Sequence, residues 1–464
     1  MRAQLRTPRT ARPEARRSGA VRAAALLCAT LAAAGCKDAV VPDLNNPSIE
    51  GVTTNPTRAQ VQALASGIII GNRAALGDQV RDLEILGRDA YNLDASDPRW
   101  ISEMLINLDP GGFGSRHWSV RYRNVKGAEV LIASVATSEA LTAAEQSATV
   151  GFAQTFKALD LLGVAETRDS LGFAVRAAAT PSDTPPLVCR DAGLTAIAAL
   201  LDSAQTALQA GGASFPFSLT SGFAGFNTPA AFVRFNRAIK ARTEIYRART
   251  EPAAYGRALA AVNASFIDPA ASLDLGVYQV YSLASGDAAN PLYQDPATAN
   301  FRAHPSVRAQ AEPGDRRVAA KIAAGANKVY QGVGSSDVFT RYADPTSPVP
   351  LVRNEELILL RAQANLGLGN LAAAQADINS IRVRSGGLAP RTYATSAAAL
   401  DDLLRQKRYS LLFESGSRWI DARLYGRLST LPVDIPGSHR VQGAFPVPQD
   451  EVLARGGAVA CTAS

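Results

Sequence analysis

The stretch RNEELILLRAQANLGLGN at 353–370, continued by LAAAQADINSIRVRSGG at 371–387, decides the fold. In both halves, large apolar residues and alanines recur at steps of three and four, which places each set on one face of a helix. The two sets are Leu357, Leu360, Ala364 and Leu368, then Leu371, Ala374, Ile378 and Ile381. Gly367, Gly369 and Asn370 lie between the sets, as a tight helix–helix connection requires. The stretch predicts an antiparallel helix pair.

This helix pair resembles one tetratricopeptide (TPR) unit, in which small residues lie where the two helices touch. The expected order of small, turn, large, small and large residues is met by Ala362, Gly369, Leu371, Ala374 and Ile378. The aromatic residue that usually stands in the first helix of such a unit is absent. An ordinary antiparallel helix pair explains the segment equally well, so both interpretations remain open.

Two later stretches, RQKRYSLLFESGSRWIDARLYGRL at 405–428 and FPVPQDEV at 445–452, carry a spaced set of charged, aromatic and proline residues. The set is Arg408, Glu414, Gly416, Arg418, Trp419, Asp421, Arg423, Pro446, Pro448 and Glu451. Together with the helix pair, this pattern resembles the SusD/RagB family of lipid-anchored nutrient-binding proteins in bacterial outer membranes. The match is incomplete, because Ser415 separates Glu414 from Gly416 and Leu411 replaces a common second Glu.

We interpret these motif residues as fold support rather than as ligand contacts. Arg418 and Asp421 are three residues apart and can pair on one helix face. Glu414 is expected to reach a neighbouring arginine.

The resemblance implies a mostly α fold, in which TPR-like helix pairs form a right-handed helical scaffold with long irregular loops on one face. We expect one SusD-like domain over 57–464. Its helix pairs are expected at about 115–163, 229–266, 352–384 and 397–425. The loop-rich segments that would form the ligand face are expected at about 87–118 and 268–350.

The N-terminus has the features of a lipoprotein signal peptide over 1–35. A basic region at 2–22 precedes an apolar run at 23–34 that is too short to span a membrane in the mature protein. The sequence AAGC at 33–36 resembles a lipobox, so the mature chain would begin at a lipidated Cys36, followed by a tether over 36–56. A plain secretory signal that is cut elsewhere is the alternative.

The positive net charge belongs to this signal. The whole chain has a formal net charge of +7, but residues 1–35 hold seven Arg and one Glu, so the mature chain would carry about +1. Net charge therefore offers no argument for a nucleic-acid partner.

The cysteines favour one disulfide. Cys28 lies in the signal and Cys36 would be lipidated, which leaves Cys189 and Cys461. An even remainder in an exported protein favours a Cys189–Cys461 disulfide, with two separate buried thiols as the alternative. Because the three histidines are widely separated and no Cys-x-x-Cys is present, we expect no metal site and no cofactor.

Aromatic and polar residues alternate in the segment 87–118, which suits sugar binding because rings stack on pyranose faces while polar groups bond the hydroxyls. The resemblance points to the same region, where SusD-like starch binders place a ligand aromatic. We expect ligand contacts from the segments 87–118 and 268–350. The candidates are Trp100, Tyr91, Arg88, Asn92 and Asp97, with Tyr281 and Tyr293 from 268–350. Alternatively, these rings hold long loops against the core.

The resemblance implies a receptor without catalytic activity, lipid-anchored in the outer membrane and facing the cell surface. It would bind an oligosaccharide or another nutrient and deliver it to a SusC-like TonB-dependent transporter. The alternatives are a TPR-type protein-interaction scaffold and a RagB-like peptide-binding lipoprotein. An enzyme is disfavoured, because nothing in the sequence places two carboxylates across a sugar as glycoside hydrolysis requires.

Overall fold

The structure is a computed structural model that describes residues 53–457 and 459–463. The predicted signal peptide (1–35), the lipidated Cys36 and most of the tether (36–56) lie outside these described residues. The described residues belong to one compact unit.

Most of this unit is helical, as the sequence predicts. None of its described helices combines the length and the apolar run needed to cross a bilayer. The long helices are α3 (Arg58–Leu86), α5 (Ser119–Val135), α6 (Ala143–Arg168), α7 (Arg190–Gln209), α8 (Pro229–Arg247), α9 (Ala254–Asn263), α12 (Asn354–Gly367), α13 (Leu371–Ile381), α14 (Ser396–Ser410) and α15 (Ser417–Leu424). The short ones are α4 (Arg99–Ile101), α10 (Pro305–Ala309), α11 (Arg316–Lys321) and α16 (Gln449–Ala454), with π-helical turns at Ser102–Ile106 and Arg382–Gly386.

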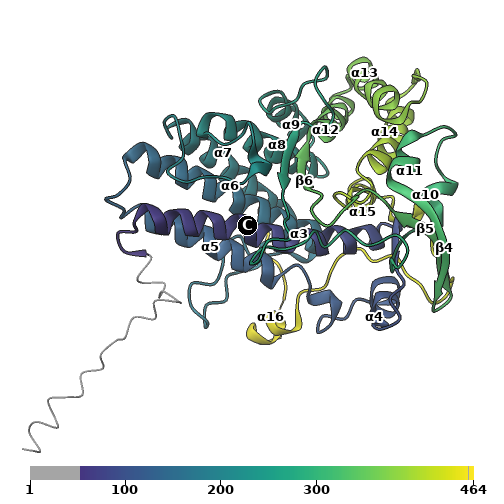
Figure 1. Ribbon diagram of the computed structural model, residues 1–464, viewed down its shortest axis with the longest axis horizontal. Coiled ribbons are helices and arrows are strands. Elements are labelled where there is room, and N and C mark those ends of the chain that lie inside the picture. Colours follow the sequence, from purple (N-terminus) through teal and green to yellow (C-terminus); the bar gives the residue numbers. More distant parts are fainter. Residues whose placement is uncertain (1–52, 458, 464) are drawn as a thin grey trace, which may run out of the picture. The chain divides into compact units, whose positions relative to one another are not determined.

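From α5 to α9 each helix packs against the next, and α9 packs against α12, which contacts α13 and α14 (Figure 1). Helix α3 contacts both α5 and α15. Its 29 residues extend over about 43 Å at 1.5 Å per residue. In its first turn Arg58 bonds Glu145 at 2.8 Å, whereas Gly87 just after its end lies against Trp419. Helix α3 therefore joins the start of the array to the later C-terminal helices.

Side-chain caps set where several of these helices begin. The Thr57 hydroxyl accepts from the backbone N–H of Gln60, and the Gln60 side chain accepts from the N–H of Thr57. Thr142 and Glu145 repeat this reciprocal capping box at α6. The Thr228 side chain caps α8, which begins at Pro229, where a missing N–H has no cost.

Helix α12 is buried on two faces. Leu357, Leu360 and Ala364 join the large core that also contains the phenylalanines of α6 and α8, whereas a second face joins a smaller core with α13 and α14. The second face consists of Ile358, Leu359 and Ala362. The prediction that Leu368 continues the buried face is wrong: α12 ends at Gly367, and the Leu368 side chain is exposed.

Strands lie in the loop-rich part of the chain. A four-stranded antiparallel sheet has the order β1-β3-β5-β4, and a two-stranded sheet pairs β2 with β6. The first comprises β1 (Ala90–Asn92), β3 (Phe301–Ala303), β5 (Val333–Phe339) and β4 (Ile322–Tyr330); the second comprises β2 (Gly276–Gln279) and β6 (Val349–Arg353). Within the first sheet, Tyr91 lies opposite Arg302, so the sheet joins the two segments that the sequence predicts to be loop-rich.

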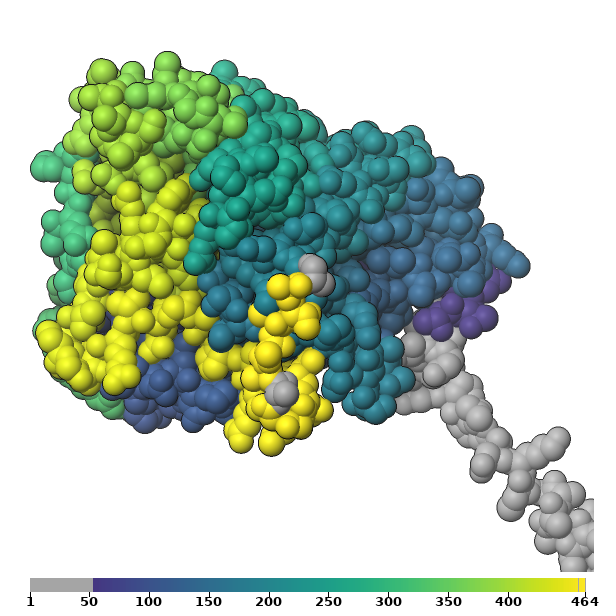
Figure 2. Space-filling view, turned by 180° about the vertical axis from the view of Figure 1, so that it is seen from behind, coloured from purple at the N-terminus to yellow at the C-terminus, as the bar shows by residue number. Residues whose placement is uncertain are grey.

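The C-terminal segment crosses the back of the early loop region (Figure 2). The backbone N–H of Arg440 donates to the Leu105 carbonyl at 2.7 Å, and that of Gln449 donates to the Pro110 carbonyl at 3.0 Å. Farther on, Cys461 forms a disulfide with Cys189, the pairing that the sequence favours. Thr462 beside it exchanges backbone hydrogen bonds with Leu187 and Cys189.

We expect Cys461→Ser to lower the free energy of unfolding by about 2–5 kcal/mol, because the disulfide restricts the unfolded chain across 272 residues. Urea unfolding of the variant and of the oxidised protein measures the difference. Identical unfolding midpoints would contradict this expectation.

Candidate functional site

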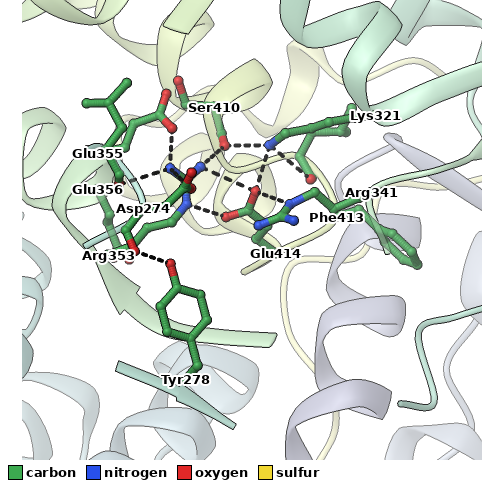
Figure 3. Close-up of polar contacts among 12 residues, drawn as sticks. Asp274, Tyr278, Lys321, Arg341, Arg353, Glu355, Glu356, Ser410, Phe413 and Glu414 are labelled. Carbon is green, nitrogen blue, oxygen red and sulfur yellow. Dashed lines mark hydrogen bonds and ion pairs between the residues drawn. The ribbon is translucent and has the colours of Figure 1, made fainter. Parts of the chain in front are cut away.

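One buried carboxylate binds three cations that lie within or just after the segment 268–350 (Figure 3). Glu414 lies in the connection between α14 and α15 and accepts hydrogen bonds from Arg353 Nε at 2.7 Å, Lys321 Nζ at 2.8 Å and Arg341 Nε at 2.8 Å. Arg353 ends β6, Lys321 ends α11 and Arg341 follows β5. The sequence predicted an arginine partner for Glu414, and the structure provides two arginines and a lysine.

Electrostatics keep this cluster charged. Burial alone would raise the pKa of Glu414, but Arg353, Lys321 and Arg341 hold it well below its usual range. Burial lowers the pKa of Lys321 to about 8, against the opposing effect of Glu414. Removing one partner from such a network leaves buried charges uncompensated. The network therefore fixes the segment 268–350 on the helical array.

A second buried carboxylate supports the same connection from α3. Glu84 accepts hydrogen bonds from the backbone N–H groups of Phe413 at 2.9 Å and Gly416 at 3.1 Å. Both donors have positive φ, so this short connection has an unusual backbone path. Burial, with the nearby charge of Asp89, raises the pKa of Glu84 to about 8.

A third carboxylate joins the segment 87–118 to α14 and α15. Asp89 accepts from Arg408 Nε at 2.7 Å and from an Arg418 terminal nitrogen at 2.8 Å. The predicted Arg418–Asp421 pair is wrong, since Asp421 instead bonds Lys407 at 2.8 Å. Both arginines bond a residue more than 300 positions away, so these motif residues connect distant parts of the fold.

Two of the predicted ligand residues lie in the core instead of on a ligand face. Arg88 is fully buried and donates to the backbone carbonyls of Ile85, Pro432 and Arg440. Tyr91 is 3% exposed and its ring lies 4.8 Å from that of His304. Tyr91 lies in β1, which pairs with β3, whereas Arg88 precedes the strand and is held by carbonyls distant in sequence; sequence spacing alone reveals neither.

Two more predicted residues are also buried. Trp100 is 8% exposed and packs edge-on against Phe113 at 4.7 Å. Tyr281 is 7% exposed, with the guanidinium of Arg73 5.4 Å from its ring centre. For these rings, the alternative that they hold long loops against the core agrees better with the structure.

Of the other three predicted residues, Asp97 and Tyr293 are partly exposed. Asn92 is buried, but its side chain accepts from the backbone N–H of Asp94 and so shapes the turn after β1. Asp97 is partly exposed and forms two hydrogen bonds with Arg99, at 2.9 and 2.8 Å. Tyr293 is half-buried against the core beneath the four-stranded sheet.

An accessible polar patch lies where the segments 87–118 and 268–350 meet. Lys328 on β4 bonds the side chain of Asn300. Hydrogen bonds from Ser96 are the main reason that the pKa of Asp94 is lowered, and the nearby Lys328 and Asn300 lower it further. Two half-buried tyrosines, Tyr293 and Tyr330, lie in the same segments and pack on one core. We define the polar patch as Asp94, Asn300, Lys328, Tyr293 and Tyr330.

Local geometry explains how the patch is assembled. The Gln294 side chain accepts from the backbone N–H groups of Asn300 and Phe301, both at 2.9 Å, and so closes the loop between Tyr293 and β3. Lys328 and Tyr330 are two positions apart on β4 and share one side of the strand. Asn300 and Lys328 were not among the residues expected from the sequence, although the alternation at 328 and 330 places Lys328 and Tyr330 on one side of a strand.

The chain has the SusD-like fold, as comparison with solved structures shows. It is similar to surface glycan-binding protein A from Bacteroides thetaiotaomicron, with a TM-score of 0.68 and 14% identity over 88% of this chain and 98% of that one. The complex of that protein with laminarihexaose gives a TM-score of 0.67 at 14% identity, over 86% and 98%. A SusD superfamily protein from Parabacteroides distasonis gives 0.66, also at 14% identity and over 86% and 98%. No protein-family model matches the chain, and no curated protein matches it in sequence.

We expect Trp100→Ala to lower the free energy of unfolding by about 3–5 kcal/mol, because it removes a buried aromatic ring. Urea unfolding measures this loss. The affinity of the folded variant for an oligosaccharide should stay within about twofold of that of the native protein. A variant with normal stability and greatly reduced affinity would instead identify Trp100 as a ligand contact.

Glu84 should make stability depend on pH. Because its pKa is raised to about 8 in the folded state, its contribution is complete below about pH 4.5 and is lost as the pH rises through 8. We expect Glu84→Gln to reduce the fall in the free energy of unfolding between about pH 5 and pH 8 by as much as a few kcal/mol. Urea unfolding across this range measures the slope.

Glu145→Gln is the matched control for that slope. A hydrogen bond from Arg58 is the main reason that the pKa of Glu145 is lowered to about 2, so its titration lies below the tested window. An unchanged slope in Glu84→Gln would refute the assignment.

Proposed function

We propose that this chain, which has the SusD-like fold, is a surface receptor that binds an oligosaccharide and delivers it to a SusC-like TonB-dependent transporter. The observation that carries the proposal is the similarity over 88% of the chain to a surface glycan-binding protein. We further propose that the mature chain is lipid-anchored through Cys36 in the outer membrane and faces the cell surface. The receptor needs no chemistry of its own, since binding alone raises the local concentration of the nutrient at the transporter.

We propose the polar patch as the glycan contact. Its tyrosines present partly exposed rings to the apolar face of a pyranose, and its lysine, amide and carboxylate groups suit sugar hydroxyls. Of the residues expected from the sequence, Tyr293 lies in this patch and Asp97 lies three positions beyond Asp94. The two half-buried rings are already packed, so little side-chain entropy is lost when a sugar stacks on them.

We expect Tyr293→Ala to weaken oligosaccharide binding by about two- to tenfold, because a stacked ring contributes about 0.5–1.5 kcal/mol. Calorimetry with laminarihexaose and other neutral oligosaccharides measures the affinity. Tyr293→Phe is the matched control, since it keeps the ring and should retain most of the affinity. Equal losses in both variants would contradict stacking, and full affinity in Tyr293→Ala would remove this residue from the site.

Co-purification tests the transporter partnership. The full-length protein is extracted from its own membranes, and mass spectrometry identifies what accompanies it. We expect a TonB-dependent barrel in near-equal amount and an acylated N-terminal peptide beginning at Cys36. Recovery of soluble protein partners alone would favour the interaction scaffold, and recovery of bound peptides would favour a RagB-like peptide receptor.

A further inference from the structure

A separate pocket of about 360 Å³ lies between α14, α15 and the segment that follows them. Four arginines line it, together with apolar side chains and the polar groups of Gln310 and Thr430. The arginines are Arg405 and Arg408 on α14, Arg418 on α15, and Arg427. The volume lies within the range of small-molecule sites and suits one or two sugar rings rather than a large segment of another protein.

The groups at this pocket leave an excess of positive charge. Arg408 and Arg418 share the single carboxylate of Asp89. Arg427 pairs with Asp401 at 2.6 Å, and Lys407 behind the wall pairs with Asp421. In total five cations face three carboxylates, so two positive charges are uncompensated. The eight groups are Arg405, Arg408, Arg418, Arg427 and Lys407, with Asp89, Asp401 and Asp421.

Several donors at the pocket are available to a ligand. Arg405 is exposed and has neither an ion pair nor a side-chain hydrogen bond within the described part of the chain. Arg418 uses one terminal nitrogen, for the Arg88 carbonyl and for Asp89. The Nε and the other terminal nitrogen of Arg418 have no partner among the residues that the structure describes. Within the same residues, Arg427 pairs with Asp401 through one terminal nitrogen, and its remaining guanidinium nitrogens have no partner.

The part of the wall that presents Arg418 is held in place before any ligand arrives. Arg408 bonds Asp89 at 2.7 Å, Gln310 at 2.7 Å and Ser306 at 2.9 Å, so its guanidinium is fixed. Asp89 fixes Arg418 in the same way at 2.8 Å. Ordered donors lose little entropy on binding, and the planar guanidinium matches a carboxylate through two parallel hydrogen bonds.

We propose that this arginine pocket binds the carboxylate of an acidic sugar, so that the receptor takes uronate-containing oligosaccharides. The inference rests on the proposed function, since it names the class of glycan. Arg405 and Arg418 would donate to the carboxylate, while Gln310 and Thr430 offer hydrogen bonds to the ring hydroxyls. The apolar part of the wall includes Leu404, on which the sugar ring can pack.

The test is calorimetry on the mature protein with oligomers of galacturonate, glucuronate and mannuronate, each compared with its methyl ester. The ester keeps the sugar ring and its hydroxyls, and replaces the charged carboxylate by a neutral group that is larger by one methyl. We expect the free acid of at least one oligomer to bind at least tenfold more tightly than its ester, with an affinity that falls as salt is added. Arg405→Gln should reduce this preference about tenfold.

Arg234→Gln is the matched control, because Arg234 is an exposed arginine on α8 that lies outside the pocket. It should leave the preference for the acid unchanged. Equal losses in Arg405→Gln and Arg234→Gln would overturn the proposal, as would equal affinity for acid and ester across all three oligomers.

Two further outcomes separate this inference from the proposed function. If neutral oligosaccharides bind and no uronate is preferred, the inference fails and the glycan receptor stands. If no oligosaccharide of either kind binds, both fail. Binding of an acidic peptide through Arg405, without binding of any uronate, would overturn the inference in favour of a protein partner.

Discussion

The rest of the structure depends on one buried carboxylate. Glu414 lies in the connection between α14 and α15, and its charge must be neutralised. Glu414 meets this requirement with Lys321 and Arg341 from the segment 268–350 and with Arg353, which lies just after that segment at the end of β6. Buried ion pairs add little net stability compared with apolar packing, but they tolerate few alternative arrangements. The network therefore specifies where the loop-rich part of the chain lies on the helical array.

Asp89 and Glu84 extend the same principle to the early part of the chain. Each carboxylate is reached by donors from α14, α15 or their connection, more than 300 residues away. As a result, α3 and the segment 87–118 are fixed against the C-terminal helices. The polar patch uses β4 and its neighbouring loops, whereas the arginine pocket uses α14 and α15.

The helices could be predicted from the sequence because their apolar residues repeat with the helical period and their caps are local. The burial of Tyr91, Trp100 and Arg88 could not, because it follows from the pairing of β1 with β3, from the packing of Trp100 on Phe113, and from the carbonyl acceptors of Arg88 at Pro432 and Arg440. Arg418 and Asp421 show the same limit. Local spacing favoured their pairing, yet each has a partner elsewhere.

Hydrogen exchange on the mature protein, with and without a saturating oligosaccharide, tests the position of the ligand face most directly. We expect the ligand to slow amide exchange at 92–97, 293–300 and 328–330, with added protection at 401–431 when the oligosaccharide is a uronate. Protection confined to the helices α8, α9, α12 and α13 would contradict this expectation, because that result would place the ligand on the helical array as a peptide-binding scaffold does.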